Sequence, residues 1–377
     1  MSKFSRTIKI LKPASSILIN EKVELLKKRK KIISLSLGEA FFKLKDFGIK
    51  KHLNDKNYHY SSSRGLDKLR KNICRDYKIK KKNFLDPKKN IIISNGAKIL
   101  TYMSMKLFLE KGDEVLTFEP AWLSYIDQAN LNGAKLKYIP FYEKITNFEK
   151  YIKKKTKILI INNPNNPSGK LYSKSEINYL FKICKKRNLV LISDECYSHF
   201  IPKNKKFYSA IELKDNKNVI VINSLSKNFG MSGWRIGYAL SHKNNIEKLV
   251  QLNQQLITCC PTILQSYVAD NYNKLKHSTK NQIKDILVRR KRILKYLEEN
   301  KFEYLDGDCT FYIFLKSNVF KDISVICNKI LLKYNISLVP GEAYGAKTNN
   351  FVRLSIGVET SKNIINALNK IKKYFVK

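Results

Sequence analysis

Lys227 is set apart from the many other lysines of this chain by the residues around it. It lies in SLSKNFGMSGWRIGY, residues 224–238, with Ser224 before it and Arg235 after it. An apolar segment of strand length precedes this stretch, and a lysine directly beyond a buried strand loses hydration, which lowers the pKa of its amine. Such an amine can act as a nucleophile or form an imine. A hydroxyl and a guanidinium beside it are groups that bind a phosphate.

Two further polar stretches follow apolar segments earlier in the chain. Asp194 comes directly after LVLIS, residues 189–193, and a carboxylate buried there needs a cationic partner to offset its desolvation. Residues 162–169 (NNPNNPSG) follow ILII, and their two Asn-Pro steps end any strand or helix. One of these steps is a candidate for a cis peptide bond, and a surface turn is the alternative interpretation.

A fourth stretch, residues 95–98 (NGAK), follows the apolar segment NIIIS and precedes a helical pattern. Small residues at the start of a helix leave backbone N–H groups open to an anion, although a tight turn has the same signature. The four stretches together offer an anion site, an amide, a carboxylate and a lysine. Pyridoxal phosphate (PLP) requires all four, for its phosphate, phenolic oxygen, ring nitrogen and aldehyde.

The segments that must position these groups alternate between two kinds. The strand candidates are short and aliphatic: residues 90–94, 114–118, 135–140, 158–161, 189–193 and 219–223. Segments with helical periodicity lie between them, such as 98–109 and 173–187. Strands that are apolar throughout are buried on both faces, which is typical of a parallel sheet covered by crossover helices. The middle of the chain is therefore predicted to be an α/β domain, with ligands beyond the carboxyl ends of its strands.

The pattern changes after about Pro261. A long helical stretch covers residues 263–299, and strand candidates at 310–316, 336–339 and 351–355 and a closing helix over 362–375 follow it. This order predicts a second, α+β domain whose boundary falls within the long helix. A chain of 377 residues, 43% of them hydrophobic, is large enough for two domains.

Charge and cysteine content narrow the class of protein. The net charge is +42, which would suit a nucleic-acid binder, but the basic residues are mostly lysines spread along the whole chain. Drift of an AT-rich coding sequence is the favoured explanation. The seven cysteines are scattered without a CxxC pair, which argues against a disulfide framework or a structural zinc site. With no apolar run long enough to span a bilayer and no secretory signal, a cytoplasmic protein is expected.

These motifs, in this order, resemble those of the class I aminotransferases, which are fold type I PLP enzymes, and above all those of the aspartate-aminotransferase-like branch. The likeness starts at residues 11–16, covers nearly the whole chain and rests on S-x-S-K-x-F-G-x-x-G-x-R-x-G, N-P-x-N-P-S-G and S-D-E-x-Y. It implies a three-layer PLP-transferase large domain with a mainly parallel sheet over residues 46–285. It also implies a smaller α+β domain formed by residues 1–45 and 286–377.

The resemblance implies that Lys227, Asp194 and Tyr197 are catalytic. Lys227 would carry PLP as an internal aldimine and then move the proton between the substrate Cα and the cofactor C4′. Asp194 would pair with the pyridinium nitrogen, so that the ring becomes an electron sink. Tyr197 and Asn166 would hydrogen-bond the phenolic oxygen, which lowers the pKa of the imine.

The remaining cofactor contacts are implied in the same way. The backbone N–H groups of Ala97 and Lys98 would bind the phosphate at a helix start, and Ser224 and Arg235 would complete its cradle. Trp122, in FEPAWLSY, would stack on the cofactor ring. A plain core aromatic is the alternative for Trp122.

The substrate would be held by three residues. Arg353, in FVRLSIG, would grip the α-carboxylate bidentately, with Asn166 and the backbone of Gly38 beside it. Tyr60, in YSSSRG, would reach the phosphate of the neighbouring subunit, so a homodimer is expected. A surface ion pair is the alternative for Arg353, and a core position for Tyr60.

The implied activity is ping-pong transamination between an L-amino acid, glutamate or aspartate, and a 2-oxo acid. No metal, nucleic acid or membrane partner is expected. A PLP-dependent lyase or decarboxylase and a transaminase for a phosphorylated keto substrate stay open. From another class, a basic binding protein on an enzyme-like scaffold predicts salt-dependent DNA binding and no cofactor.

Two stretches depart from the family pattern. Residues 38–42 read GEAFF where the family usually has GEPDF, so loop closure is expected to differ. Residues 258–261 read TCCP where the family more often has Ser or Thr and Asn, so the side-chain specificity is expected to differ. Lys106 is a further candidate for reaching a distal carboxylate or phosphate.

Overall fold

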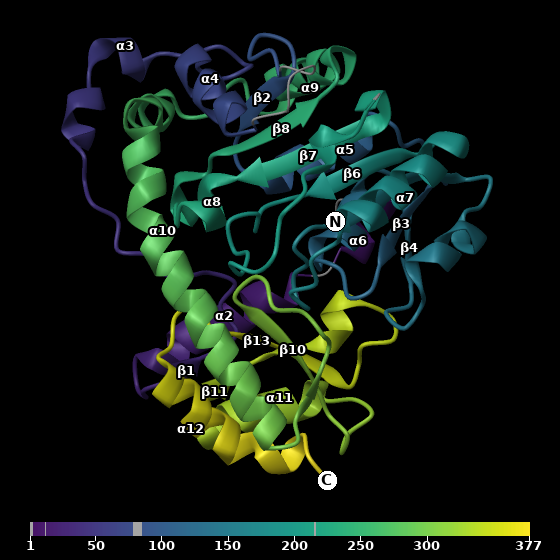
Figure 1. The fold of residues 1–377 in the computed structure, drawn as a ribbon, viewed down its shortest axis with the longest axis vertical. Coiled ribbons are helices and arrows are strands. Elements are labelled where there is room, and N and C mark those ends of the chain that lie inside the picture. Colours follow the sequence, from purple (N-terminus) through teal and green to yellow (C-terminus); the bar gives the residue numbers. More distant parts are fainter. Residues whose placement is uncertain (1–2, 12, 78–84, 215) are drawn as a thin grey trace.

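A seven-stranded sheet forms the centre of the computed structural model, which describes residues 3–11, 13–77, 85–214 and 216–377 (Figure 1). The strands lie in the order β2-β8-β7-β6-β5-β3-β4. Their bounds are Ile91–Ser94 (β2), Glu114–Phe118 (β3), Lys135–Ile139 (β4), Thr156–Asn162 (β5), Val190–Asp194 (β6), Val219–Ser224 (β7) and Gly237–Ser241 (β8). Only β8 runs antiparallel to its neighbours in this sheet. The predicted α/β class with a mainly parallel sheet is therefore confirmed.

Helices cover both faces of this sheet. One face carries α4 (Asp67–Asp76), α7 (Lys174–Lys186) and the first part of α10 (Thr262–Glu299), and the other carries α5 (Ala97–Lys106), α6 (Ser124–Leu131) and α9 (Lys243–Leu256). Successive side chains of a strand point to opposite faces, and Ile91 and Ile92 accordingly enter the two different cores. Apolar residues at consecutive positions thus produce the three layers.

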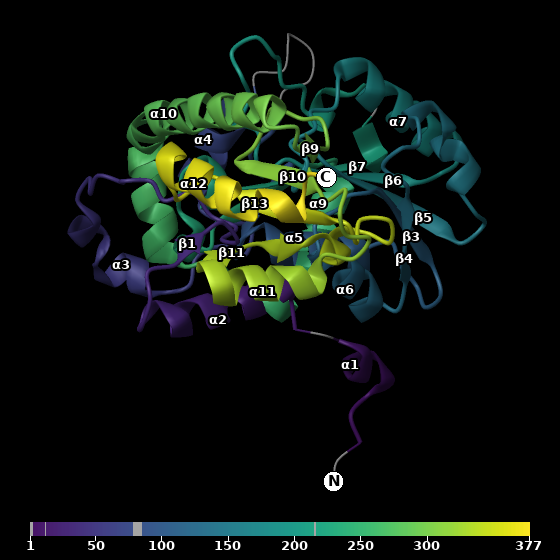
Figure 2. The same cartoon turned by 90° about the horizontal axis from the view of Figure 1, so that it is seen from below.

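A smaller antiparallel sheet lies beyond the carboxyl ends of the central strands. It has the order β12 (Val339–Pro340), β13 (Phe351–Ser355), β10 (Tyr312–Lys316) and β9 (Glu303–Tyr304). Helices α11 (Ser324–Tyr334) and α12 (Ser361–Ile371) share its core, together with the second half of α10. Helix α10 runs from one sheet to the other (Figures 1 and 2). Because the boundary between residues 285 and 286 falls inside α10, the proposed domain division stays a prediction.

The N-terminal segment forms a separate two-stranded sheet with a strand from the C-terminal part of the chain. β1 (Ile33–Ser34) pairs in parallel with β11 (Ile336–Ser337). The α-helices not yet named are α1 (Arg6–Ile10), α2 (Ser15–Lys27) and α3 (Asp55–Tyr58) near the N-terminus, and α8 (Leu225–Asn228) after β7. Short 3₁₀ helices lie at Ile49–His52, Ile145–Tyr151, Ala210–Glu212, Asn216–Asn218, Ser232–Trp234, Gly341–Tyr344 and Lys372–Tyr374. Figure 2 shows α1 at the edge of the molecule, where it lies next to α6. Residue 12, within the segment where the family likeness starts, lies outside the described residues.

The predicted strands and helices lie close to their predicted positions, except that residues 336–339 form two strands instead of one, because β11 pairs with β1 and β12 pairs with β13. The strands β1, β8 and β9 were not predicted. Both Asn-Pro bonds of residues 162–169 are cis, as is the bond between Glu119 and Pro120.

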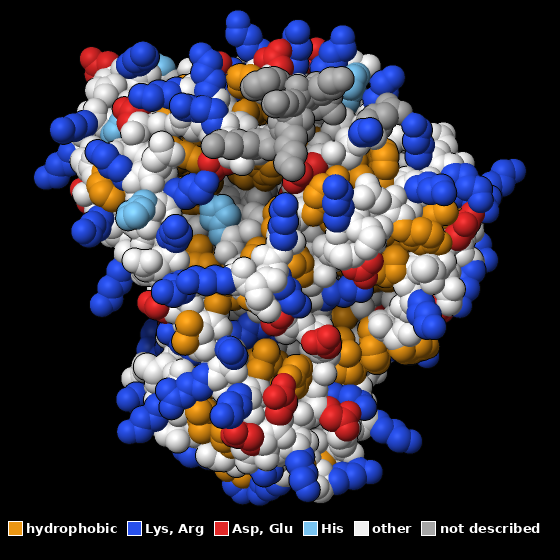
Figure 3. All heavy atoms as spheres, in the orientation of Figure 1, with side chains coloured by type: hydrophobic (Ala, Val, Ile, Leu, Met, Phe, Trp, Pro, Cys, Tyr) orange, Lys and Arg blue, Asp and Glu red, His pale blue; other side chains and the backbone are white. Residues whose placement is uncertain are grey.

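The distribution of charged side chains, cysteines and possible metal ligands is relevant to the other functions considered, which are nucleic-acid binding, metal binding and membrane association. Figure 3 shows Lys and Arg side chains scattered over the whole visible face, without a single basic stripe. The seven cysteines are free thiols. Within the described part of the chain, no three His, Cys, Asp or Glu side chains come together as a metal site would require, and no helix could cross a membrane.

Candidate active site

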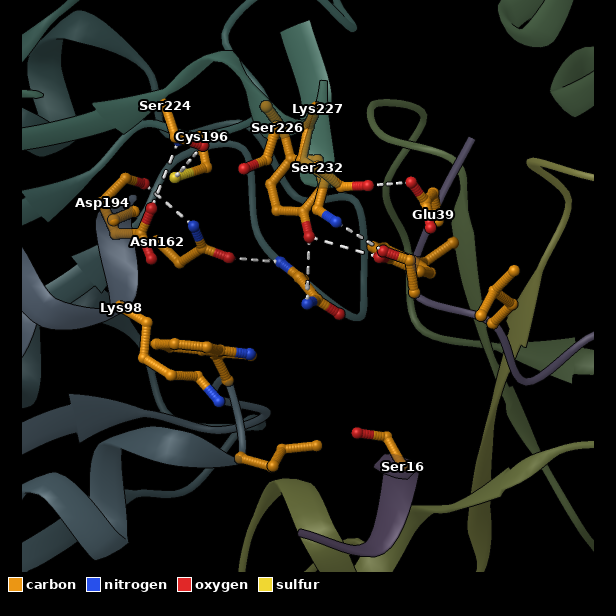
Figure 4. Close-up of a pocket in the computed structure, with 18 of the residues that line it drawn as sticks. Ser16, Glu39, Lys98, Asn162, Asp194, Cys196, Ser224, Ser226, Lys227 and Ser232 are labelled. Carbon is orange, nitrogen blue, oxygen red and sulfur yellow. Dashed lines mark hydrogen bonds between the residues drawn. The ribbon is translucent and has the colours of Figure 1, made fainter. Parts of the chain in front are cut away.

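One cavity of about 310 Å³ lies at the carboxyl ends of β5, β6 and β7, facing β10 and β13 of the smaller sheet (Figure 4). Eleven of the twelve predicted site residues line it: Gly38, Ala97, Lys98, Trp122, Asn166, Asp194, Tyr197, Ser224, Lys227, Arg235 and Arg353. They come from separate parts of the sequence, and the sheet brings them together because its parallel strands end at one edge.

Lys227 enters the cavity from α8, which begins directly after β7. Its Nζ donates a hydrogen bond to the carbonyl oxygen of Gly38 at 2.7 Å. Burial lowers the pKa of the Lys227 amine, the charge of Glu39 opposes this shift, and the charges of Arg353 and Arg235 reinforce it. A lowered pKa increases the neutral fraction of the amine, which is the form that attacks a carbonyl.

Asp194 is the last residue of β6 and is only 5% exposed. The hydroxyl of Tyr125 donates to its Oδ2 at 2.8 Å, and the backbone N–H of Cys196 donates to its Oδ1 at 3.2 Å. Burial raises the pKa of the Asp194 carboxyl, and these hydrogen bonds oppose the shift. Asp194 forms no ion pair among the described residues. A cationic N–H group bound in the cavity would therefore give its carboxylate a counter-ion.

Asn166 and Tyr197 meet on the same side of the cavity. The amide nitrogen of Asn166 donates to the Tyr197 hydroxyl at 3.3 Å, and that hydroxyl lies 3.3 Å from the hydroxyl of Tyr312. Asn162 holds this arrangement, since its Oδ1 accepts the backbone N–H of Asn166 at 2.6 Å and its Nδ2 donates to the carbonyl of Asp194 at 2.9 Å. The Oδ1 of Asn166 is buried and has no partner in the described chain.

The start of α5 and the residues after β7 place hydrogen-bond donors at the cavity. Helix α5 begins at Ala97 without a side-chain cap, so its first N–H groups are open. Gly96 has φ 88°, and a Cβ there would lie 2.5 Å from Nη2 of Arg235. The exposed guanidinium of Arg235 is oriented by a 2.8 Å hydrogen bond from Nη1 to the carbonyl of Ser232. Together with the Ser224 hydroxyl, these groups suit a phosphate.

Arg353 projects from β13 and is 3% exposed. Its Nη2 donates to the carbonyl of Ser36 at 2.7 Å, and the guanidinium lies 4.5 Å from the centre of the Tyr312 ring. Its Nε is buried without a partner, and Arg353 forms no ion pair within the described residues. A Cβ on Gly38 would come within 3.6 Å of Arg353 Nη2, so the glycine keeps the space beside the guanidinium open.

Four of the candidate residues have different outcomes. Lys98 and Trp122 line the cavity together, with Lys98 Nζ 5.4 Å from the centre of the Trp122 ring. The hypothesis for Lys106 is wrong, because this residue is exposed in the last turn of α5 and Lys98 supplies the amine at the cavity. Tyr60 is 86% exposed and does not line the cavity, so its role at a subunit interface stays a prediction.

The two departures from the family pattern have definite places. In the GEAFF loop, Glu39 accepts a hydrogen bond from the Ser232 hydroxyl, and the Phe42 ring occupies the space over Gly230, where a Cβ would lie 2.5 Å from it. These two contacts hold the loop against residues 230 and 232 without the family's proline and acid. In the TCCP stretch, Cys260 is fully buried and is not among the lining residues, so the cavity gives no support to a change of specificity there.

Several residues of the site were not predicted from the sequence. Asn162 directly precedes the N-P-x-N-P-S-G motif and Cys196 lies inside S-D-E-x-Y, so their neighbours were a usable signal. Tyr125 follows the predicted Trp122 by less than one helical turn, but nothing in the sequence indicates that its hydroxyl reaches Asp194. Tyr312 reads as one more aromatic residue of a buried strand.

Comparison with known proteins agrees with this geometry. The family model for aminotransferase class I and II matches residues 31–371. A (5-formylfuran-3-yl)methyl phosphate transaminase from Methanocaldococcus jannaschii is 33% identical, with 92% of each chain covered. An aspartate aminotransferase from Pyrococcus abyssi is also 33% identical, over 88% of this chain and 89% of its own length. The solved aromatic aminotransferase of Pyrococcus horikoshii has a TM-score of 0.85 and 28% identity, covering 94% of this chain and 98% of its own.

The family match covers most of the chain, and the relatives match it over nearly their full lengths. The family uses PLP, and the cavity combines a lysine, a carboxylate and groups that suit an anion at the strand ends where the sequence motifs lie. The chain therefore belongs to the aminotransferase class I and II family and is an aminotransferase of its aspartate-aminotransferase-like branch.

Proposed function

We propose that this chain binds PLP at Lys227 and transfers an amino group from L-glutamate or L-aspartate to a 2-oxo acid. One observation carries the proposal: Lys227, Asp194 and Arg353 face one cavity, and none of them forms an ion pair among the described residues. A buried charge without a counter-ion is costly, so the complementary groups are expected on the ligands. A pyridinium nitrogen suits Asp194, and a substrate carboxylate suits Arg353.

The other lining groups fit the same cofactor. The open N–H groups at Ala97, the Ser224 hydroxyl and the Arg235 guanidinium would hold its phosphate. The Asn166 amide and the Tyr197 hydroxyl would hold its phenolic oxygen. The fit involves both ends of the cofactor, which a single polar patch would not provide.

The reaction assigns distinct tasks to the residues of this chain. When bound, PLP supplies an aldehyde that carries the amino group and a ring that takes up the electrons of the broken Cα–H bond. Lys227 removes the proton at the substrate Cα and returns it on the cofactor side, for which its lowered pKa is suited. Asp194 holds the proton of the ring nitrogen. Arg353 fixes the carboxylate, so that the Cα–H bond points toward Lys227.

The position of Lys98 favours an amino acid donor with an acidic side chain. The Lys98 amine lies beside Trp122 at the cavity and has no acidic hydrogen-bond partner in the described chain. The test is a screen of donors and acceptors, with phosphorylated keto compounds as one arm. Lys98→Met is expected to raise KM for glutamate by about 10-fold, roughly the loss of one exposed charge contact, and to leave KM for alanine nearly unchanged. Equal effects on both donors, or release of CO₂ or ammonia in place of a 2-oxo acid, would refute this assignment.

The quaternary structure is part of the proposal. Tyr60 is exposed in the single chain, and its proposed partner is the phosphate bound by a second subunit in a homodimer. Light scattering is expected to give twice the chain mass at all concentrations tested, and Tyr60→Phe should weaken cofactor retention without changing that mass. A monomer with full activity would contradict the role of Tyr60. The expectation of a cytoplasmic enzyme likewise stays a proposal.

A further inference from the structure

Tyr312 lies where the cofactor side and the substrate side of the site meet, and the proposed reaction gives it no task. It is 1% exposed on β10, its hydroxyl lies 3.3 Å from that of Tyr197, and its ring lies 4.5 Å from the guanidinium of Arg353. Its backbone carbonyl accepts a hydrogen bond from the guanidinium of Arg290, a fully buried residue of α10. The position of Tyr312 is therefore fixed from both ends.

The hydroxyl of Tyr197 has one proton and three neighbours. The amide nitrogen of Asn166, at 3.3 Å, can only donate to it. The third neighbour is the cavity, where the phenolic oxygen of the cofactor would lie. If Tyr197 donated its proton to Tyr312, the Tyr197 oxygen would present only lone pairs to the phenolic oxygen of the cofactor, which is itself an acceptor. All groups are satisfied when Tyr312 donates to Tyr197 and Tyr197 donates into the cavity.

We propose that Tyr312 is a positioning residue whose hydroxyl donates to Tyr197 and thereby directs the single Tyr197 proton at the phenolic oxygen of the cofactor. This inference rests on the proposed function. The Tyr312 hydroxyl has no other hydrogen-bond partner among the described residues. Burial raises the pKa of Tyr312, with Arg353 opposing the shift, so the hydroxyl remains a donor at working pH. Hydrogen bonds that run in one direction strengthen each other, which makes Tyr197 the stronger donor.

The consequence is visible in the spectrum of the bound cofactor. A strong hydrogen-bond donor would stabilise the negative charge on the phenolic oxygen. The imine between Lys227 and the cofactor would then lose its proton at lower pH, so its pKa would be lower. The pH midpoint of the visible absorbance change therefore reports the Tyr312–Tyr197 contact. A role confined to packing under Arg353 would alter KM for the amino acid and leave this midpoint in place.

The experiment compares the midpoint in wild type, Tyr312→Phe and Tyr344→Phe, each saturated with PLP. Tyr344 is the matched control. It is buried, the centre of its ring lies 5.6 Å from the guanidinium of Arg353, and its hydroxyl has no hydrogen-bond partner in the described chain. Tyr312→Phe is expected to raise the midpoint by about 0.5 pH unit and Tyr344→Phe by less than about 0.1 unit. In a Tyr197→Phe background, Tyr312→Phe is expected to add nothing.

The outcomes separate this inference from the proposed function. Wild type without a visible band in PLP would refute the proposed function. A wild-type band with an unchanged midpoint in Tyr312→Phe, or an equal shift in the Tyr197→Phe background, would refute the inference alone. If Tyr312→Phe does not retain the cofactor, 3-fluorotyrosine is introduced at position 312. This more acidic donor must lower the midpoint, and no change or a rise overturns the inference.

Discussion

Replacing Arg353 tests how the substrate carboxylate is held. The guanidinium is 3% exposed, donates one N–H to the carbonyl of Ser36 and leaves Nε without a partner. Two charge-assisted hydrogen bonds to a carboxylate contribute about 1.5–3 kcal/mol each, so Arg353→Met is expected to lose about 3–6 kcal/mol, or about 10²–10⁴-fold in the second-order rate constant. Arg353→Lys keeps the charge without the fork and is expected to lose about 10–100-fold.

The assay is the half-reaction with L-glutamate, followed by stopped-flow absorbance of the PLP-loaded protein. Arg289→Met is the control, since this half-buried arginine of α10 donates to the carbonyl of Ile356 at 2.8 Å and does not line the cavity. Thermal unfolding of ligand-free Arg353→Met should show little loss of stability, because removal of a buried cation that has no counter-ion offsets the lost hydrogen bond to the carbonyl of Ser36. A loss of less than about 10-fold in Arg353→Met would refute a bidentate carboxylate contact.

Three further changes test separate parts of the structure. Tyr125→Phe removes the 2.8 Å hydrogen bond to Asp194 and is expected to lower kcat about 5–10-fold, measured at saturating glutamate; an unchanged kcat would contradict it. Arg290→Met removes the donor from the backbone carbonyls of Ser168, Gly307 and Tyr312 and is expected to lower the free energy of unfolding by about 3 kcal/mol in urea titrations, against less than about 1 kcal/mol for Arg289→Met. Burial lowers the pKa of His199 to about 4, with Lys276 contributing, from an ordinary value of 6.5. Because the unfolded chain takes up this proton at higher pH than the folded chain, stability is lost as pH falls from 6.5 to about 4, by at most about 3 kcal/mol, and His199→Gln should flatten that loss.

The sequence predicted the central sheet well because its strands are apolar throughout. Strands that are apolar throughout indicate burial on both faces of the sheet, and the polar residue after each strand indicates the edge where a ligand would bind. β8 (Gly237–Ser241) was not predicted because its first residue, Gly237, is also the last residue of the S-x-S-K-x-F-G-x-x-G-x-R-x-G motif. The break between β11 and β12 depends on pairing with β1 and β13, which are far away in the sequence.

The site was predictable where a motif names the residue and unpredictable where a tertiary contact gives the residue its role. Lys227 and Asp194 are identified by what precedes them in the chain. Tyr125 and Tyr312 are identified only by hydroxyl groups that meet another strand or loop at 2.8 and 3.3 Å. Lys98 could not be separated from Lys106 by charge, because the helical phase that turns one to the cavity and the other to solvent depends on where α5 begins.

The most direct test of the central claim is the visible spectrum of the purified protein with PLP, before and after L-glutamate is added in the absence of any acceptor. Wild type is expected to show a visible band that disappears with glutamate, with about one equivalent of 2-oxoglutarate released per subunit, as a ping-pong reaction requires. Lys227→Ala is expected to show neither the band nor the 2-oxoglutarate. A wild-type spectrum that glutamate leaves unchanged, or a Lys227→Ala protein that behaves like wild type, would contradict the account.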